Sequence, residues 1–161
     1  MYEELFSIWV PWHERNSLDG AKYPGIYIAA ISNENIAGES FGWIPEIIYI
    51  GMTNSVSGLK GRLKQFDNTI AGKSGHGGAD RVLYKYQDYE ELTLKLYISV
   101  RSFSCDVKSN HPTDLRIMGM VAKFEYDCFA YFVEKFGELP EFNNKKKSPK
   151  YSLAFGRSNG G

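Results

Sequence analysis

Two stretches decide the fold: Gly25-Ile-Tyr-Ile-Ala-Ala-Ile31 and Glu46-Ile-Ile-Tyr-Ile-Gly51. Both are rich in β-branched and aromatic residues and are bounded by residues that break regular structure, which predicts two strands. The segment between them, 32–45, is too long for a two-residue turn and suits an extended hairpin loop. We therefore expect the two strands to pair in antiparallel fashion.

Each of these strands carries a tyrosine at its centre. Isoleucines flank Tyr27 at positions 26 and 28, and Tyr49 at positions 48 and 50, so each phenol should lie on the strand face opposite its neighbours. Antiparallel pairing would bring the two phenols onto one face within cross-strand distance. Two ordinary half-buried tyrosines are the alternative, in a chain that contains 11 of them.

A helix is predicted to follow the second strand. Four apolar residues recur with the spacing of one helical face: Leu59, Leu63, Phe66 and Ile70. Ser55 or Ser57 can serve as the N-cap, and the helix should end near Gly72. The glycine-rich segment 72–78 then predicts a flexible or tightly turning loop.

The second half of the chain predicts a third strand and a long helix. Residues 93–100 alternate in polarity, and one strand face would hold Leu94, Leu96, Ile98 and Val100. The helix should run from Thr113 or Asp114 to about Lys135 and end at Gly137. Its apolar face is predicted to consist of Leu115, Met118, Ala122, Phe129, Val133 and Phe136.

Composition indicates one soluble, cytoplasmic domain. The chain has 161 residues, 43% of them hydrophobic and 24% charged, which is ordinary for a single globular core. Its formal net charge is zero, so any contact with nucleic acid must come from local clustering of basic residues. The chain has only two cysteines and no recognisable secretion signal, which predicts a cytoplasmic location. It has no apolar run of membrane-spanning length, so we expect no membrane partner.

Glu125 is the most informative single residue. Its neighbours one turn away in the long helix are apolar: Val121, Ala122, Cys128 and Phe129. An ionised carboxylate leaves water only when it is paired, metal-bound or protonated. Glu125 is therefore a ligand for a hard cation at a phosphate site, a member of a structural ion pair, or a residue at the edge of the apolar face.

Five short motifs occur in order along the chain: Pro24-Gly25-Ile26-Tyr27, Ile48-Tyr49-Ile50-Gly51, Gly58-Leu59 with Arg62-Leu63, Glu125, and Leu139-Pro140-Glu141-Phe142-Asn143. Together they resemble the ordered motifs of the GIY-YIG nuclease family. The resemblance implies a small α/β (α+β) domain around a three-stranded antiparallel sheet flanked by helices. On this basis we expect an N-terminal strap at 1–23, a catalytic domain at 24–144 and a basic C-terminal tail at 145–161.

The resemblance also implies a role for each matched residue. Glu125 would hold one divalent cation, Mg²⁺ or Mn²⁺, and Arg62 would neutralise the scissile phosphate. Tyr27 and Tyr49 would orient or deprotonate the attacking water, and Asn143 would support the site from the end of the long helix. Mg²⁺ suits a single carboxylate because it keeps much of its hydration shell.

One position departs from the family pattern. Many members carry a histidine one turn after the arginine, where this chain has Phe66. His76, in the glycine-rich loop, could serve as the base or proton shuttle instead, or could simply contact phosphate or solvent. The identity of the general base therefore stays open.

The implied function is that of a divalent-metal-dependent DNA endonuclease, of a stand-alone, restriction-like kind. Homing, mobile-element and structure-specific repair nucleases are alternatives within the same class. A non-catalytic nucleic-acid-binding domain is the alternative from another class, but such a domain would not need a carboxylate that repels phosphate. A homodimer would allow both DNA strands to be cut.

Basic residues that could contact DNA fall into three groups: Lys60 and Lys64 on the first helix, Lys73 and Arg81 beside the glycine-rich loop, and Lys145, Lys146 and Lys147 after the last motif. The lysine run should leave the domain close to the site, because it follows Asn143 directly. A solvated tail is the alternative for that run.

Overall fold

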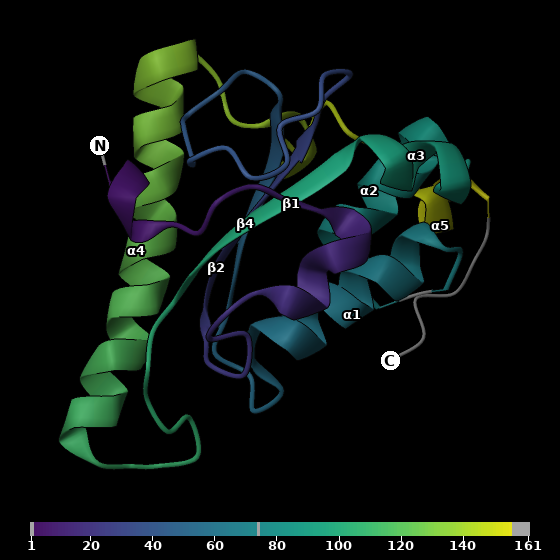
Figure 1. The fold of residues 1–161 in the computed structure, drawn as a ribbon. Coiled ribbons are helices and arrows are strands. Elements are labelled where there is room, and N and C mark those ends of the chain that lie inside the picture. The colour runs from purple at the N-terminus through teal and green to yellow at the C-terminus, as the bar shows by residue number, and fades with distance from the viewer. Residues whose placement is uncertain (1, 74, 156–161) are drawn as a thin grey trace.

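The computed structural model describes residues 2–73 and 75–155 (Figure 1). Within these ranges no helix is both long enough and apolar enough to cross a membrane. The elements in chain order are η1 (Glu3–Leu5), β1 (Val10–Pro11), η2 (Trp12–Ser17), β2 (Gly25–Ile31), β3 (Ile47–Thr53), α1 (Gly58–Ile70), α2 (Gly77–Tyr86), α3 (Tyr89–Lys95), β4 (Leu96–Ser102), α4 (Pro112–Phe136), η3 (Glu141–Asn143) and α5 (Tyr151–Ala154).

The mixed α/β fold is built on an antiparallel sheet with the strand order β1-β4-β2-β3. The antiparallel pairing of β2 with β3 is confirmed, but the sheet has four strands and not the three that the sequence predicted. The additional strand, β1, pairs Val10 and Pro11 with Ile98 and Tyr97 of β4. Two residues cannot show an alternating pattern, so the sequence indicated only a packed strap here.

Helices cover both faces of the sheet (Figure 1). The core on one face includes Tyr27 and Ala29 of β2 together with residues of α1 and α2. The core on the other face includes Ile26 and Ile28 together with residues of α4. Both faces of β2 are therefore shielded from solvent, which explains why the sequence of this strand is almost entirely apolar.

A β-bulge in β3 changes the side-chain pattern around Tyr49. The register with β2 shifts between Ala29 and Ala30, which leaves Ile48 without a partner in β2. Ile48 consequently packs in the core on the α1 side, whereas Ile50 packs on the α4 side. The expectation that both isoleucines lie opposite Tyr49 is wrong for Ile48.

The predicted first helix is confirmed as α1, and its start is fixed against the chain that leads into β2. The first residue, Gly58, has φ +65°, a conformation that side chains other than hydrogen rarely adopt. The N–H groups of Leu59 and Lys60 donate to the carbonyls of Tyr23 and Ala21. These bonds satisfy amides that a helix start otherwise leaves unpaired, and they hold α1 beside the strand that carries Tyr27.

Helices α2 and α3 were not predicted. The sequence of α2 opens with two glycines, which are poor helix formers, and its start depends on the His76 side chain as N-cap. Helix α3 is capped by Asp88 and includes the first residues of the predicted third strand, so β4 begins only at Leu96. Leu94 is 76% exposed, not buried as the alternation suggested.

Helix α4 confirms the predicted long helix, and Gly137 ends it in the left-handed conformation. Its buried residues are Val121, Phe124, Cys128 and Phe132. The predicted core face is wrong for Leu115 and Val133, which are 50% and 38% exposed, and for the exposed Ala122, whereas Phe129 and Phe136 are partly buried against the core. Apolar residues occupy two adjoining faces of α4, and periodicity does not show which of them meets the sheet.

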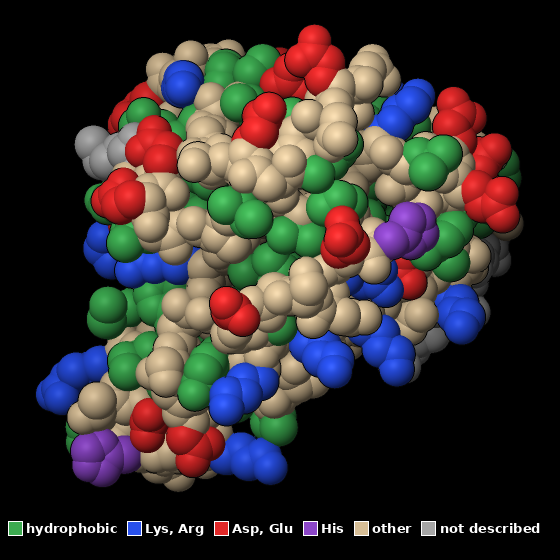
Figure 2. Space-filling model, in the orientation of Figure 1, with side chains coloured by type: hydrophobic (Ala, Val, Ile, Leu, Met, Phe, Trp, Pro, Cys, Tyr) green, Lys and Arg blue, Asp and Glu red, His purple; other side chains and the backbone are tan. Residues whose placement is uncertain are grey.

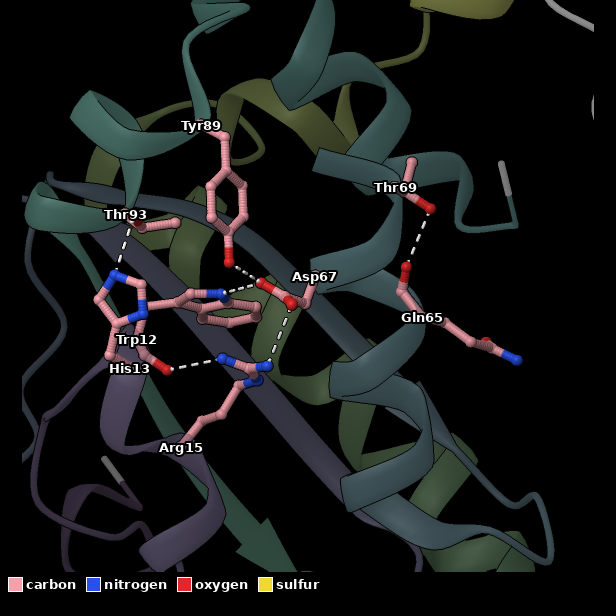
Figure 3. Close-up of polar contacts among 8 residues, drawn as sticks. All are labelled: Trp12, His13, Arg15, Gln65, Asp67, Thr69, Tyr89 and Thr93. Carbon is pink, nitrogen blue, oxygen red and sulfur yellow. Dashed lines mark hydrogen bonds and ion pairs between the residues drawn. The ribbon is translucent and has the colours of Figure 1, made fainter. Parts of the chain in front are cut away.

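Asp67 of α1 connects three segments that are distant in the sequence (Figure 3). Its carboxylate accepts hydrogen bonds from the Trp12 indole N–H and the Tyr89 hydroxyl, both at 2.8 Å, and forms an ion pair with Arg15 at 3.1 Å. Arg15 also donates to the carbonyl of Trp12 and lies over its ring. Burial, together with the Asp67 carboxylate, raises the pKa of Tyr89 to about 12. This network holds the N-terminal segment and α3 against α1.

We expect Asp67→Asn to lower the free energy of unfolding by about 2 kcal/mol, because the ion pair with Arg15 is lost and the two hydrogen bonds from Trp12 and Tyr89 lose their charge assistance. Urea denaturation at pH 7 measures the change. Asp127→Asn is the matched control, since Asp127 pairs with the exposed Lys123 on α4 and should cost less than about 0.5 kcal/mol. Equal losses in the two variants would contradict the role given to Asp67.

Candidate active site

Tyr27 and Tyr49 lie on the same face of the sheet, the face covered by α1 and α2. Tyr27 pairs with Gly51 and Tyr49 pairs with Ala29, so the two phenols are diagonal neighbours. Their ring centroids are 6.0 Å apart. Tyr27 is 1% exposed, whereas Tyr49 is partly open to solvent. The two tyrosines are thus neighbours, one buried in the core and the other partly open to solvent.

Two glycines make room for these rings. A Cβ atom at Gly51 would lie 2.3 Å from Cζ of Tyr27, and one at Gly78 would lie 2.4 Å from Cζ of Tyr49. Gly78 therefore allows the first turn of α2 to lie directly on the Tyr49 ring. The sequence showed Gly78 only as part of a glycine-rich loop, because its role depends on packing between distant segments.

His76 links the start of α2 to Tyr27. Its Nδ1 accepts the N–H of Ala79 at 3.1 Å, and its Nε2 lies 2.7 Å from the Tyr27 hydroxyl oxygen. Because Nδ1 acts as an acceptor, the neutral ring carries its proton on Nε2 and donates to Tyr27. The ring also packs edge to face on Phe66, at 5.0 Å between centroids. The hydrophobic Phe66 side chain thus supports a histidine that comes from another element.

Burial controls the protonation of all three groups. Burial and then the Arg62 charge lower the pKa of His76 to about 3. Burial also raises the pKa of Tyr27 well above its ordinary value and raises that of Tyr49, and in both cases the Arg62 charge opposes the shift. At neutral pH the imidazole is therefore uncharged and both phenols are protonated. His76 is accordingly a weak base, well suited to fix the orientation of the Tyr27 hydroxyl.

Arg62 lies at the mouth of this cluster. It is half-buried on α1, its Nε is 3.4 Å from the Tyr27 hydroxyl oxygen, and its Nη1 donates to the Gln65 side chain at 2.8 Å. Its charge opposes the rise that burial causes in the pKa of Tyr27, Tyr49 and Glu125. Arg62 is thus the cation that these three side chains share.

Glu125 reaches the cluster from α4, the helix on the opposite face of the sheet. It lies at the edge of the buried face of α4 and is partly exposed. Burial raises its pKa to about 6, although the Arg62 charge acts in the opposite direction. Among the described residues its carboxylate makes no hydrogen bond or ion pair. A partly desolvated carboxylate without a partner fits a hard cation such as Mg²⁺ or Mn²⁺.

A cation bound at Glu125 would take its other ligands from water and from substrate oxygens. Within residues 2–73 and 75–155, no group of three or more His, Cys, Asp or Glu side chains is arranged so that it could hold a metal ion. This agrees with the sequence-based prediction, in which Glu125 was the single carboxylate ligand of the metal.

Asn143 acts on the backbone of the edge strand β3. It lies in η3, beyond the end of α4, and not at the end of the long helix itself. Its Oδ1 accepts the N–H of Ile50 at 2.8 Å, and its Nδ2 donates to the carbonyl of Ile50 at 2.9 Å. This pair of bonds occupies the free edge of β3 directly beside Tyr49, as a further strand would.

The predicted DNA-contacting residues differ in their surroundings. Five are exposed lysines: Lys60, Lys64, Lys73, Lys145 and Lys146. Lys147 is also exposed but forms an ion pair with Glu138 at 3.2 Å. On the face shown in Figure 2, Lys and Arg side chains gather toward the lower edge, below α1, and acidic side chains are more frequent in the upper half. The basic residues are thus unevenly distributed despite a net charge of zero.

Arg81 and Lys150 border the start of α2. Arg81 donates to the carbonyls of Gly77 and Ser148, which fastens the C-terminal segment to α2. A Cβ atom at Gly77 would lie 3.4 Å from Nζ of Lys150 and 3.8 Å from Nη1 of Arg81. Both cations therefore stand beside the loop that presents His76. The last part of the predicted C-terminal tail, 156–161, lies outside the described residues.

Comparison of the chain with protein-family models, curated proteins and solved structures found no match. The interpretation of this site therefore rests on its side chains and their geometry.

We expect Glu125→Gln to raise the free energy of unfolding by about 1 kcal/mol at pH 8, after allowance for the partial exposure of the side chain. A carboxyl group whose folded pKa is raised from 4.5 to about 6 stabilises the fold fully below pH 4.5 and loses that contribution as the pH rises through 6. The difference between variant and wild type should therefore vanish at pH 4. Urea denaturation at both pH values measures it, and a pH-independent difference would contradict the desolvation of Glu125.

Proposed function

We propose that this chain is a divalent-metal-dependent DNA endonuclease of the GIY-YIG type, which hydrolyses phosphodiester bonds as a stand-alone, restriction-like enzyme. One arrangement carries the proposal: the Tyr27 hydroxyl lies 3.4 Å from Nε of Arg62, the Tyr49 ring lies beside Tyr27, and the Arg62 charge opposes the raised pKa of both Tyr49 and Glu125. Two phenols, a guanidinium and an unpartnered carboxylate supply what phosphodiester hydrolysis needs, namely an oriented water, a cation for the phosphate and a metal ligand.

Each side chain has a part in this chemistry. Arg62 would bind a non-bridging phosphate oxygen and stabilise the charge that grows on it. The partly exposed Tyr49 would hold the attacking water, and Asn143 keeps the strand beneath it in place. A Mg²⁺ or Mn²⁺ ion held by Glu125 would supply further positive charge for the phosphate and for the leaving oxygen.

His76 would be a positioning residue for Tyr27. The Tyr27 oxygen accepts a hydrogen bond from His76 Nε2 and a longer one from Arg62 Nε. With both donors in place, the phenol directs its own proton toward the open side of the cluster, where Tyr49 lies. Tyr27 can then orient the Tyr49 hydroxyl, and through it the attacking water, while His76 stays neutral.

The distribution of basic residues supports DNA as the substrate. Lys73 follows the helix that carries Arg62, whereas Lys60 and Lys64 project from the opposite side of that helix, about 160° from Arg62. Arg81 and Lys150 lie beside the loop that presents His76. A duplex that places one phosphate on Arg62 would meet Lys73, Arg81 and Lys150 with its neighbouring phosphates.

The test is single-turnover cleavage of plasmid and branched DNA by the purified chain with Mg²⁺. We expect cleavage to be lost in Glu125→Gln, which keeps the shape of the side chain but removes the charge that holds the metal. Glu90→Gln, at an exposed position on α3, should cut at the wild-type rate. Wild-type cleavage should also fall as the pH drops below about 6, where Glu125 becomes protonated.

Arg62→Ala separates catalysis from binding in the same assay. It should slow the chemical step by an amount equivalent to about 2 to 4 kcal/mol and weaken DNA binding much less. Lys73→Ala, which removes an exposed cation just beyond the end of the same helix, should affect affinity alone. Undiminished cleavage by Glu125→Gln would rule out the metal assignment, and equal effects of Arg62→Ala on rate and affinity would reduce Arg62 to a phosphate contact.

A further inference from the structure

Helix α4 carries a second apolar face that is largely exposed, although its Phe129 is partly buried against the core. Six of its residues follow one another at alternating intervals of four and three: Leu115, Gly119, Ala122, Tyr126, Phe129 and Val133. We call this set the outer stripe. Tyr126 is 72% exposed, and Leu115 and Val133 are 50% and 38% exposed. The outer stripe lies about 120° around the helix axis from the buried face, which contacts β3 and β2.

The spacing and the sizes of these residues fit a helix of the same sequence. Alternation of three and four residues is the pattern of a seam between two helices. If α4 packs antiparallel on a second α4 with the two-fold axis near residue 124, the stripe forms self-complementary layers. Tyr126 then faces Ala122 of the second copy, Phe129 faces its Gly119, and Leu115 faces its Val133. Each ring meets a small residue, and Gly119 has open space where a Cβ would stand.

The charges beside the outer stripe favour the same arrangement. Arg116 and Lys123 border its N-terminal half, and Asp127 and Glu134 border its C-terminal half on the same flank. Antiparallel packing sets Arg116 opposite Glu134 of the second copy, and Lys123 opposite its Asp127. Parallel packing would set like charges side by side, which opposes association. The one sequence thus provides both halves of a charge-matched interface.

We propose that the outer stripe is a homodimer interface, in which α4 packs antiparallel on α4 of a second copy about a two-fold axis near residue 124. Glu125 stands beside this axis, on the flank of the stripe that faces the active site. Helix axes in contact are about 8–10 Å apart. The dimer therefore brings the two Glu125 side chains close together on one side. Given the proposed nuclease function, two such sites can address both strands of one duplex.

Sedimentation of the full chain without DNA or metal tests the interface independently of any nuclease activity. We expect a concentration-dependent monomer–dimer equilibrium. Ala122→Arg, which places a charge in the central layer, should raise the dissociation constant by about 10-fold or more. Leu94→Arg is the matched control, since Leu94 is an exposed apolar residue on α3 and should leave the equilibrium unchanged.

Charge exchange tests the antiparallel register. Arg116→Glu and Glu134→Arg should each weaken the dimer, and the double variant should restore it, because the two positions face each other only in the antiparallel arrangement. A chain that stays monomeric up to about 200 μM, well above the micromolar affinity of an ordinary interface, overturns the proposal. So does a double variant that remains dissociated. If the chain is monomeric and Ala122→Arg weakens DNA binding, the outer stripe belongs to a DNA contact instead.

Discussion

Two tyrosine side chains, each with a polar hydroxyl, pack in the apolar layer between the sheet and helices α1 and α2. Most of the site geometry follows from that constraint. A buried hydroxyl needs a hydrogen-bond partner, and for Tyr27 the partner is Nε2 of His76 at 2.7 Å. The rings also need space, which Gly51 and Gly78 provide. The imidazole in turn needs a fixed tautomer, and it obtains one by capping α2 through Nδ1.

The position of α2 is therefore a condition for the site, and the C-terminal segment contributes to it. The Asp80 carboxylate accepts the hydroxyl of Ser152 at 2.5 Å, and Arg81 donates to the carbonyl of Ser148. These bonds hold the first turns of α2 from the side remote from the sheet. Part of the segment that the sequence presented as a basic tail thus belongs to the scaffold of the site.

Local patterns predicted the elements whose signals are local. Strands β2 and β3, helix α1 and the extent of α4 follow from β-branched runs, apolar periodicity and a terminal glycine. Strand β1 has too few residues to show a pattern. Helix α2 depends on the side chain of His76 at a glycine-rich start, and the core face of α4 depends on which of two apolar faces meets the sheet.

For the candidate site, too, some residues could be predicted from the sequence and others could not. Tyr27, Tyr49, Arg62 and Glu125 could be named from motif order and from one carboxylate among apolar residues. The contact of His76 with Tyr27, the need for glycine at 78 and the hold of Asn143 on Ile50 could not be named, because each joins segments far apart in the chain.

The role of the buried phenol is tested by single-turnover DNA cleavage with Tyr27→Phe, because this substitution keeps the ring and removes only the hydroxyl that His76 and Arg62 hold. We expect the cleavage rate to fall by about 100-fold or more, while the free energy of unfolding falls by about 1 to 3 kcal/mol because the His76 N–H loses its acceptor. Tyr89→Phe, which removes a partly buried hydroxyl from the Asp67 network, should lose similar stability and keep the wild-type rate. A Tyr27→Phe variant that cuts DNA as fast as the wild type would contradict the account.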